Sequence, residues 1–115
     1  MGNFVAHGYS EPWFNINVLT EKTTKTSATL YFDGNLDSVV EYEFYFYHDE
    51  WDDRTQTSKP VIDKYLDLEV GENLIEGLYS GYYYNIGYRA KYKSYDGSEI
   101  LDTGHKYINS FNTNA

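Results

Sequence analysis

The sequence predicts an all-β fold, a Greek-key β-sandwich of about seven strands preceded by an N-terminal arm. Three observations favour this class. Aromatic residues make up 19% of the 115 residues, and the 14 tyrosines among them suit pleated, half-buried surfaces. Short segments that alternate apolar and polar residues recur along the chain, with turn residues between them. No segment of any length carries the apolar spacing of an amphipathic helix.

Two segments alternate most clearly and are expected to be central strands. In residues 40–47 one face is apolar, and the other carries glutamate and tyrosine side chains. In residues 82–92 the inward face is aromatic or aliphatic, as expected for a strand with one buried side. The side chains expected to share these inward faces are Val40, Tyr42, Phe44, Phe46, Tyr84, Ile86, Tyr88 and Ala90.

Shorter strands are expected on both sides of these two. They are residues 14–20, 28–32 and 74–78, with one or two short strands between 65 and 70, and a final strand supplied by residues 98–102 together with 107–111. Residues 48–59 are polar and acidic, and we expect them to form a long loop. The dipeptide Asp96-Gly97 suits a two-residue hairpin turn of type I′.

The chain divides into an arm, residues 1–13, and one sandwich domain, residues 14–115. A chain of 115 residues has the usual length of a single domain. The arm contains two glycines, one proline and three aromatic residues suited to anchor it, Phe4, Tyr9 and Trp13. Because chain termini are ordered only where something holds them, the arm is expected to pack on a partner or to fold back on its own domain.

The segment from Gly77 to Ala90 resembles a corner motif of fibronectin type III domains, G-L-x-P-G-T-x-Y-x-V-x-V-x-A. The positions that agree with the motif are Leu78, Gly81, Tyr84, Ile86, Tyr88 and Ala90. Ser80 and Tyr82 replace its Pro and Thr, and Phe32 stands where this family commonly has a core Trp. The resemblance covers residues 14–104 and implies a fibronectin type III-like, immunoglobulin-like sandwich that binds other proteins. It makes Tyr84 a corner tyrosine, whose hydroxyl bonds to the upstream backbone.

The resemblance also implies that residues 40–47 and 82–92 are antiparallel neighbours. Glu41 and Glu43 would then lie near Arg89 and Lys91 on the solvent face, where opposite charges stabilise strand pairing. Tyr45 and Tyr47 would lie near three residues of the partner strand, Gly87, Asn85 and Tyr83. An aromatic ring opposite a strand glycine covers the exposed backbone there.

Charge and composition exclude several classes of partner. The formal net charge is −9, and the nine Lys and Arg residues are scattered, so neither nucleic acid nor an anionic membrane surface is expected to bind. The absence of cysteine excludes disulfides, thiolate chemistry and cysteine-based zinc sites. We see no secretory signal and no apolar stretch long enough to span a membrane, so the chain is expected to be made in the cytoplasm and to end in a virion or, alternatively, to remain in the cytoplasm.

Two groups of aromatic residues are candidate partner-binding sites. Trp51 lies within the acidic segment 49–54, either as a docking tip or folded back over the sheet edge. Tyr45, Tyr47 and Tyr83 form either an exposed patch that contacts a partner or an ordinary sheet surface, which the N-terminal arm could also cover.

No pattern points to catalysis, to a cofactor or to a metal. The run Asp33-x-Asn35-x-Asp37-Ser38 resembles the start of a calcium loop, but Ser38 replaces the required glycine and Phe44 stands at the position of the bidentate Glu. We therefore interpret it as a solvated turn. The three histidines lack metal-ligand spacing, and no nucleophile-elbow motif is present, so we do not expect an enzyme.

Three functions agree with these features. The first is an accessory or decoration protein of a bacteriophage virion, bound to other structural proteins of the capsid or tail, since virion proteins are made in the cytoplasm without an export signal. The second is a carbohydrate- or receptor-binding adhesion module, in which exposed aromatic rings stack on sugars, including host-surface glycans. The third is a cytoplasmic acidic adaptor or inhibitor.

Overall fold

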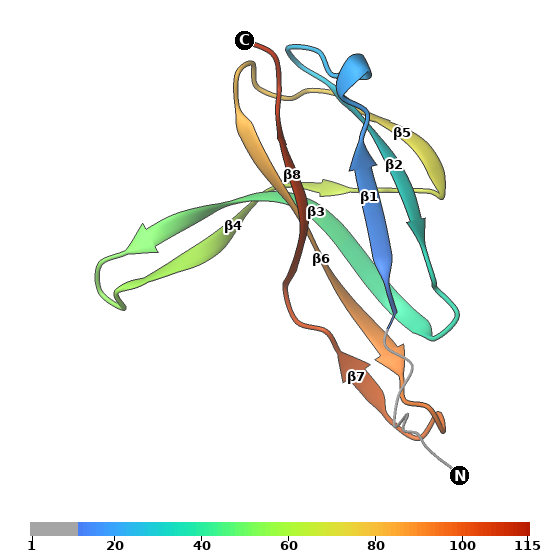
Figure 1. Cartoon of the computed structure of the whole chain (residues 1–115). Coiled ribbons are helices and arrows are strands. Elements are labelled where there is room, and N and C mark those ends of the chain that lie inside the picture. The colour runs from blue at the N-terminus through green and yellow to red at the C-terminus, as the bar shows by residue number, and fades with distance from the viewer. Residues whose placement is uncertain (1–11) are drawn as a thin grey trace.

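The structure is a computed structural model that describes residues 12–115. This part of the chain folds into β-strands joined by short turns, with one 3-10 turn, η1 (Thr20–Lys22), and no α-helix. The strands are β1 (Phe14–Val18), β2 (Ala28–Gly34), β3 (Val39–Asp52), β4 (Thr57–Leu66), β5 (Gly71–Ile75), β6 (Tyr83–Lys93), β7 (Ile100–Asp102) and β8 (Lys106–Asn112). The prediction of an all-β chain is therefore confirmed (Figure 1).

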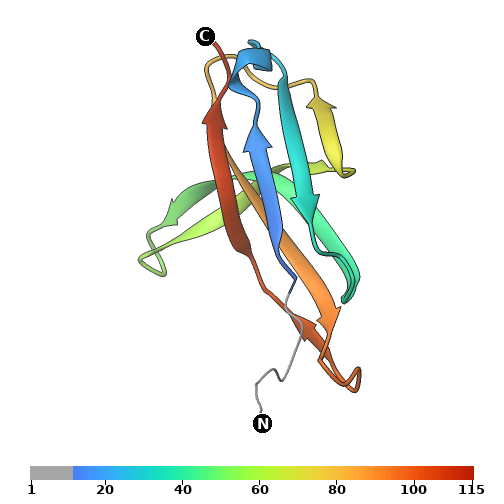
Figure 2. The ribbon, with the colours of Figure 1, turned by 45° about the vertical axis from the view of Figure 1, so that its right-hand side comes forward.

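The strands form two antiparallel sheets that face each other as in a β-sandwich (Figure 2). The smaller sheet has the order β1-β2-β5. The larger sheet has the order β4-β3-β6, and both β7 and β8 pair with β6 on its far side. One side of the sandwich is closed where β8 runs beside β1, and there the Asn109 side-chain amide donates to the Ile16 carbonyl at 2.8 Å.

The core lies between the sheets and is rich in aromatic residues. Phe32 from the smaller sheet and Phe44 from the larger one meet with ring centroids 4.9 Å apart. The fully buried large side chains are Phe32, Phe44, Phe46, Ile16, Leu30 and Ile86. Burying each of these contributes roughly 1.5–3 kcal/mol, which explains why their alternation identified the central strands.

The predicted inward faces are confirmed for most positions. On β6, Tyr84, Ile86 and Ala90 are buried as expected. At the start of β3, however, Val40 and Tyr42 remain exposed.

The corner tyrosine is confirmed as well. The Tyr84 hydroxyl accepts the backbone N–H of Tyr79 at 2.9 Å and so fixes the loop that leads into β6. Tyr79 lies between β5 and β6, outside any strand, and the hydroxyl satisfies its backbone N–H there.

The prediction of a long loop over residues 48–59 is wrong. β3 continues to Asp52, the turn is closed by a hydrogen bond from Gln56 N–H to the Asp52 carbonyl at 2.8 Å, and β4 returns beside β3. We call residues 48–61 the projecting hairpin, because they extend away from the two packed sheets (Figure 1). Both faces of the hairpin are largely exposed to solvent. Neither face therefore needs the apolar residues that a strand packed in the sandwich carries on its inner face.

Two further local predictions are also corrected. Asp96-Gly97 does not form a type I′ turn, which requires positive φ at both central residues. Gly97 has φ +74°, whereas the φ of Asp96 is negative. The Gly97 N–H donates to the Ser94 carbonyl, and the Asp96 carboxylate accepts the backbone N–H of Ser98, so the turn is centred one residue earlier. Residues 68–70 lie outside any strand, and the next strand, β5, begins at Gly71.

Candidate binding surface

The outer face of the larger sheet carries the predicted pairing of β3 with β6. Glu41 lies opposite Lys91, and Glu43 lies opposite Arg89. Farther along the strands, Tyr45 lies opposite Gly87, and Tyr47 lies opposite Asn85. The predicted antiparallel register between these two strands is therefore confirmed.

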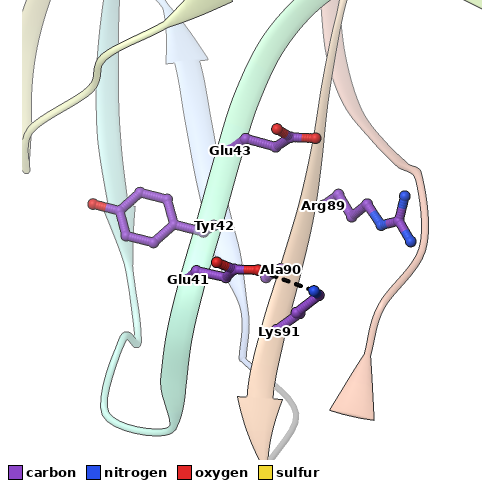
Figure 3. A pocket seen from close by; sticks show the side chains of 6 residues that line it. All are labelled: Glu41, Tyr42, Glu43, Arg89, Ala90 and Lys91. Atoms are coloured by element: carbon purple, nitrogen blue, oxygen red, sulfur yellow. Dashed lines mark ion pairs between the residues drawn. The ribbon is translucent and has the colours of Figure 1, made fainter. Parts of the chain in front are cut away.

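The charged end of this face forms a shallow depression whose side chains largely neutralise one another (Figure 3). Lys91 Nζ lies 3.1 Å from Glu41 Oε1. Arg89 points away from Glu43 and pairs with Asp102 of β7, with its Nη2 2.8 Å from Asp102 Oδ2. The hydrogen bond from Arg89 lowers the pKa of Asp102 to about 2. Because these pairs are exposed to solvent, they contribute little to the stability of strand pairing.

Tyr45 and Tyr47 are buried, each only 3% exposed, so of the alternatives that the sequence left open, the exposed patch does not hold for these two residues. The cause is Gly87, since a Cβ atom there would lie 2.8 Å from the Tyr47 ring and 2.9 Å from the Tyr45 ring. The two rings therefore occupy the space above Gly87, and they meet edge to face with centroids 6.0 Å apart. His105 stacks on Tyr45 from outside, and its Nδ1 is 2.6 Å from the Tyr45 hydroxyl. Burial raises the pKa of Tyr45 to about 12.

Three other tyrosines form the exposed rim around this buried pair. Tyr83 is 52% exposed, as the sequence predicted, and Tyr107 and Tyr65 are exposed as well. The hydroxyls of Tyr83 and Tyr107 both donate to Ser110 Oγ, at 2.7 and 3.1 Å, which holds the two rings side by side. Tyr65 packs edge-on against Tyr45. We call Tyr45, Tyr47, Tyr65, Tyr83, Tyr107 and His105 the tyrosine surface.

Sequence reasoning missed Tyr65, Tyr107 and His105. Tyr65 reaches the surface through the pairing of β4 with β3, where it lies opposite Tyr45. Tyr107 reaches it through the pairing of β8 with β6, where it lies opposite Gly87. Both pairings contain bulges. Simple alternation along the sequence therefore does not predict which side chains share the outer face of the larger sheet.

Trp51 occupies the tip of the projecting hairpin and is 60% exposed, so it does not fold back over the sheet edge. Its Nε1 donates to Asp53 Oδ1 at 2.7 Å. Alternate residues of β3 point to the same face, and β3 runs without an extra residue from Tyr45 to Trp51. The indole ring therefore lies on the same face of the sheet as the tyrosine surface.

Trp13, another of the predicted anchors, does not join this face. Trp13 is exposed at the start of β1 in the smaller sheet, where its carbonyl accepts the Asn35 N–H at 2.9 Å. Phe4 and Tyr9 lie outside the described residues.

The run that resembles a calcium loop closes on itself. Asp33 Oδ1 accepts the Gly34 N–H at 2.8 Å, and Asn35 Oδ1 accepts the Asp37 N–H at 3.0 Å. Throughout residues 12–115, no group of three or more His, Asp or Glu side chains is arranged to hold a metal ion. In the same range, no helix has the length and apolar character needed to cross a membrane.

Comparisons with known families, curated proteins and solved structures give no match to this chain. The tyrosine surface and the projecting hairpin are therefore the two candidate binding sites of the described residues.

Proposed function

We propose that the chain is a Greek-key, fibronectin type III-like sandwich that acts as a non-enzymatic protein-binding module. The division of strands supports this family, since β1, β2 and β5 face a sheet built on β3, β4 and β6. The hydrogen bond from the Tyr79 N–H to the Tyr84 hydroxyl supports it too, because such a corner is a hallmark of these sandwiches.

The observation that carries the proposal is the exposure of Trp51 at the end of the projecting hairpin. Tryptophan is enriched among residues that dominate binding energy when buried at the centre of an interface. The indole N–H is already bonded to Asp53, so both ring faces can enter an apolar pocket without leaving a donor unpaired. The hairpin carries this ring beyond the body of the sandwich, where a partner can reach it.

The edge of the hairpin indicates how the partner binds. β4 is an edge strand, and it contains Lys59, Pro60 and Lys64. The register passes from Lys64 opposite Phe46 to Ile62 opposite Tyr47, so Asp63 forms a bulge between them. Lysine, proline and bulges on an edge discourage the addition of another strand. Recognition therefore takes place through side chains rather than through backbone pairing.

We further propose that the chain is an accessory or decoration protein of a bacteriophage virion, bound to structural proteins of the capsid or tail. A small sandwich with a long hairpin suits this task, because the body stays outside the shell while the hairpin reaches a neighbouring subunit. The net charge of −9 favours a partner with a basic surface around its pocket.

Co-sedimentation with purified particles of the source tests this proposal. We expect the wild-type chain to bind and Trp51→Ala to bind at least about 10-fold more weakly, as for other central tryptophans. Tyr31→Ala serves as a matched control, because Tyr31 is an exposed aromatic residue of the smaller sheet. Unchanged binding of Trp51→Ala would refute the role of the hairpin, and particles that never bind the chain would refute the virion setting.

A glycan is the second candidate ligand. An exposed indole ring beside carboxylates suits a sugar, because the ring stacks on its C–H face while the carboxylates accept its hydroxyls. Glycan binding that disappears in Trp51→Ala, together with no binding to particles, would favour this alternative.

A further inference from the structure

The face of the projecting hairpin opposite to Trp51 carries a histidine between two carboxylates. His48 Nδ1 lies 2.8 Å from Asp63 Oδ1, and His48 Nε2 lies 2.7 Å from Glu50 Oε2. His48 and Glu50 belong to β3, whereas Asp63 belongs to β4. The imidazole therefore connects the two strands of the hairpin through side chains, in addition to their backbone hydrogen bonds.

This connection requires a protonated ring. A neutral imidazole carries one N–H, so one of its nitrogens would present a lone pair to a carboxylate oxygen. The imidazolium donates from both nitrogens and also places a positive charge between two negative ones. The geometry around His48 is therefore that of the charged form.

The position of the cluster gives it influence over the hairpin. Asp63 is the bulge residue of β4, located where the hairpin leaves the sandwich. The register places Lys59 and Lys64 of β4 on the same face as His48. Asp52 of β3 lies on this face as well, with its Oδ2 3.4 Å from Lys59 Nζ. Tyr82 lies in the loop before β6. Its pKa is raised mainly by burial and, to a smaller extent, by nearby groups that include Asp63 and Glu50. These are the charged and titratable groups around His48 on the hairpin and the adjoining loop.

We propose that His48 is a proton-controlled clamp: as an imidazolium it holds the projecting hairpin rigid, and as a neutral ring it releases one strand. Rigidity keeps the Trp51 side chain in a single orientation and lowers the entropic cost of binding. The effect on binding rests on the proposed function, whereas the clamp itself is a property of the free chain.

The direction of the pH effect follows from the cluster. The hydrogen bonds to Glu50 and then to Asp63 raise the pKa of His48 above its ordinary value of 6.5, although its partial burial opposes them. A raised folded-state pKa means that the clamp stabilises the fold fully below pH 6.5. This contribution is lost as the pH rises through the higher, folded-state value.

NMR of the free protein tests the clamp directly. A titration of the His48 ring signals gives the pKa of this residue. Amide protection factors of residues 49–61 report opening of the hairpin, because they are corrected for the intrinsic pH dependence of hydrogen exchange. We expect His48 to titrate above 6.5. We expect the hairpin protection to fall by about 3- to 10-fold between pH 5.5 and pH 8, the size expected for the net loss of one hydrogen bond. Protection in β1 and β2 serves as the internal reference.

Variants separate the clamp from a general change in stability. His48→Gln is expected to give low hairpin protection at every pH, and His48→Arg, which keeps a charged donor, to give high protection at every pH. Glu72→Gln, which removes an exposed ion pair with Lys22 on the smaller sheet, is the control and is expected to retain the wild-type pH profile. A His48 that titrates at or below 6.5, or a pH profile that persists in His48→Gln, would overturn the proposal. Because no partner is present, failure of the proposed function would not affect this result.

Discussion

At the scale of single residues, one glycine organises the outer face of the larger sheet. Gly87 provides the space in which the rings of Tyr45 and Tyr47 lie over the backbone, with His105 stacked outside them. The tyrosines thereby cover backbone that would otherwise be open to water, and they are unavailable as direct contacts for a partner. Among the tyrosines of the tyrosine surface, Tyr65, Tyr83 and Tyr107 are the exposed ones.

Gly87→Ala is expected to destabilise the fold by about 1–3 kcal/mol, the range for overpacking a well-filled site. The added Cβ would meet both tyrosine rings and lie 3.0 Å from the Lys106 carbonyl oxygen, which belongs to the backbone and cannot rotate away. Urea unfolding monitored by circular dichroism measures the change. Asn85→Ala, on the same face of β6, serves as the control, and equal stability of Gly87→Ala and wild type would contradict this account.

Sequence reasoning succeeded at this scale where one residue decides the geometry. The covering of Gly87 by Tyr45 and the bonding role of Tyr84 were both implied by the resemblance to the fibronectin type III corner motif and its strand pairing. Exposure did not follow, because how far Tyr47 is buried depends on His105, a residue from a distant segment. The pairing of Arg89 with Asp102 was missed for the same reason, since Glu43 was the only carboxylate that the β3–β6 register brought near it.

At the scale of elements, the projecting hairpin is the feature that sequence reasoning described least well. Alternation reveals a strand only when one face is buried, and residues 48–59 have solvent on both faces. The identity of Trp51 and its acidic neighbours was visible in the sequence, but the strands that present it were not. The clamp at His48 was hidden likewise, because Asp63 comes close only through the bulge in β4.

Shortening the hairpin is expected to leave the sandwich intact. Replacing residues 51–58 by Asn-Gly joins Glu50 to Lys59, which already lie opposite each other, and it retains His48 and Asp63. Since the deleted segment contributes no core residue, we expect the free energy of unfolding to change by less than about 1 kcal/mol. Urea unfolding measures this value, and loss of a single cooperative transition would contradict the view that the hairpin is an appendage.

At the scale of the whole molecule, the two ends of the larger sheet have different roles. Its packed part, β3 with β6, carries the core on one side and the tyrosine surface on the other. Its outer part, the projecting hairpin, carries Trp51 and contributes nothing to the core. The sandwich architecture was predictable from sequence because burial imposes a period of two on its strands, whereas a surface made for a partner carries no such constraint.

Site-specific photo-crosslinking in the native source tests the central claim, protein binding through the hairpin tip, most directly. A photoreactive phenylalanine analogue replaces Trp51 in one variant and Tyr31 in the other, and mass spectrometry identifies the adducts. We expect position 51 to give one discrete adduct with a structural protein of the virion, and position 31 to give none. If position 51 yields no protein adduct while the chain is folded and present, the hairpin does not bind a protein, and the proposed function is wrong.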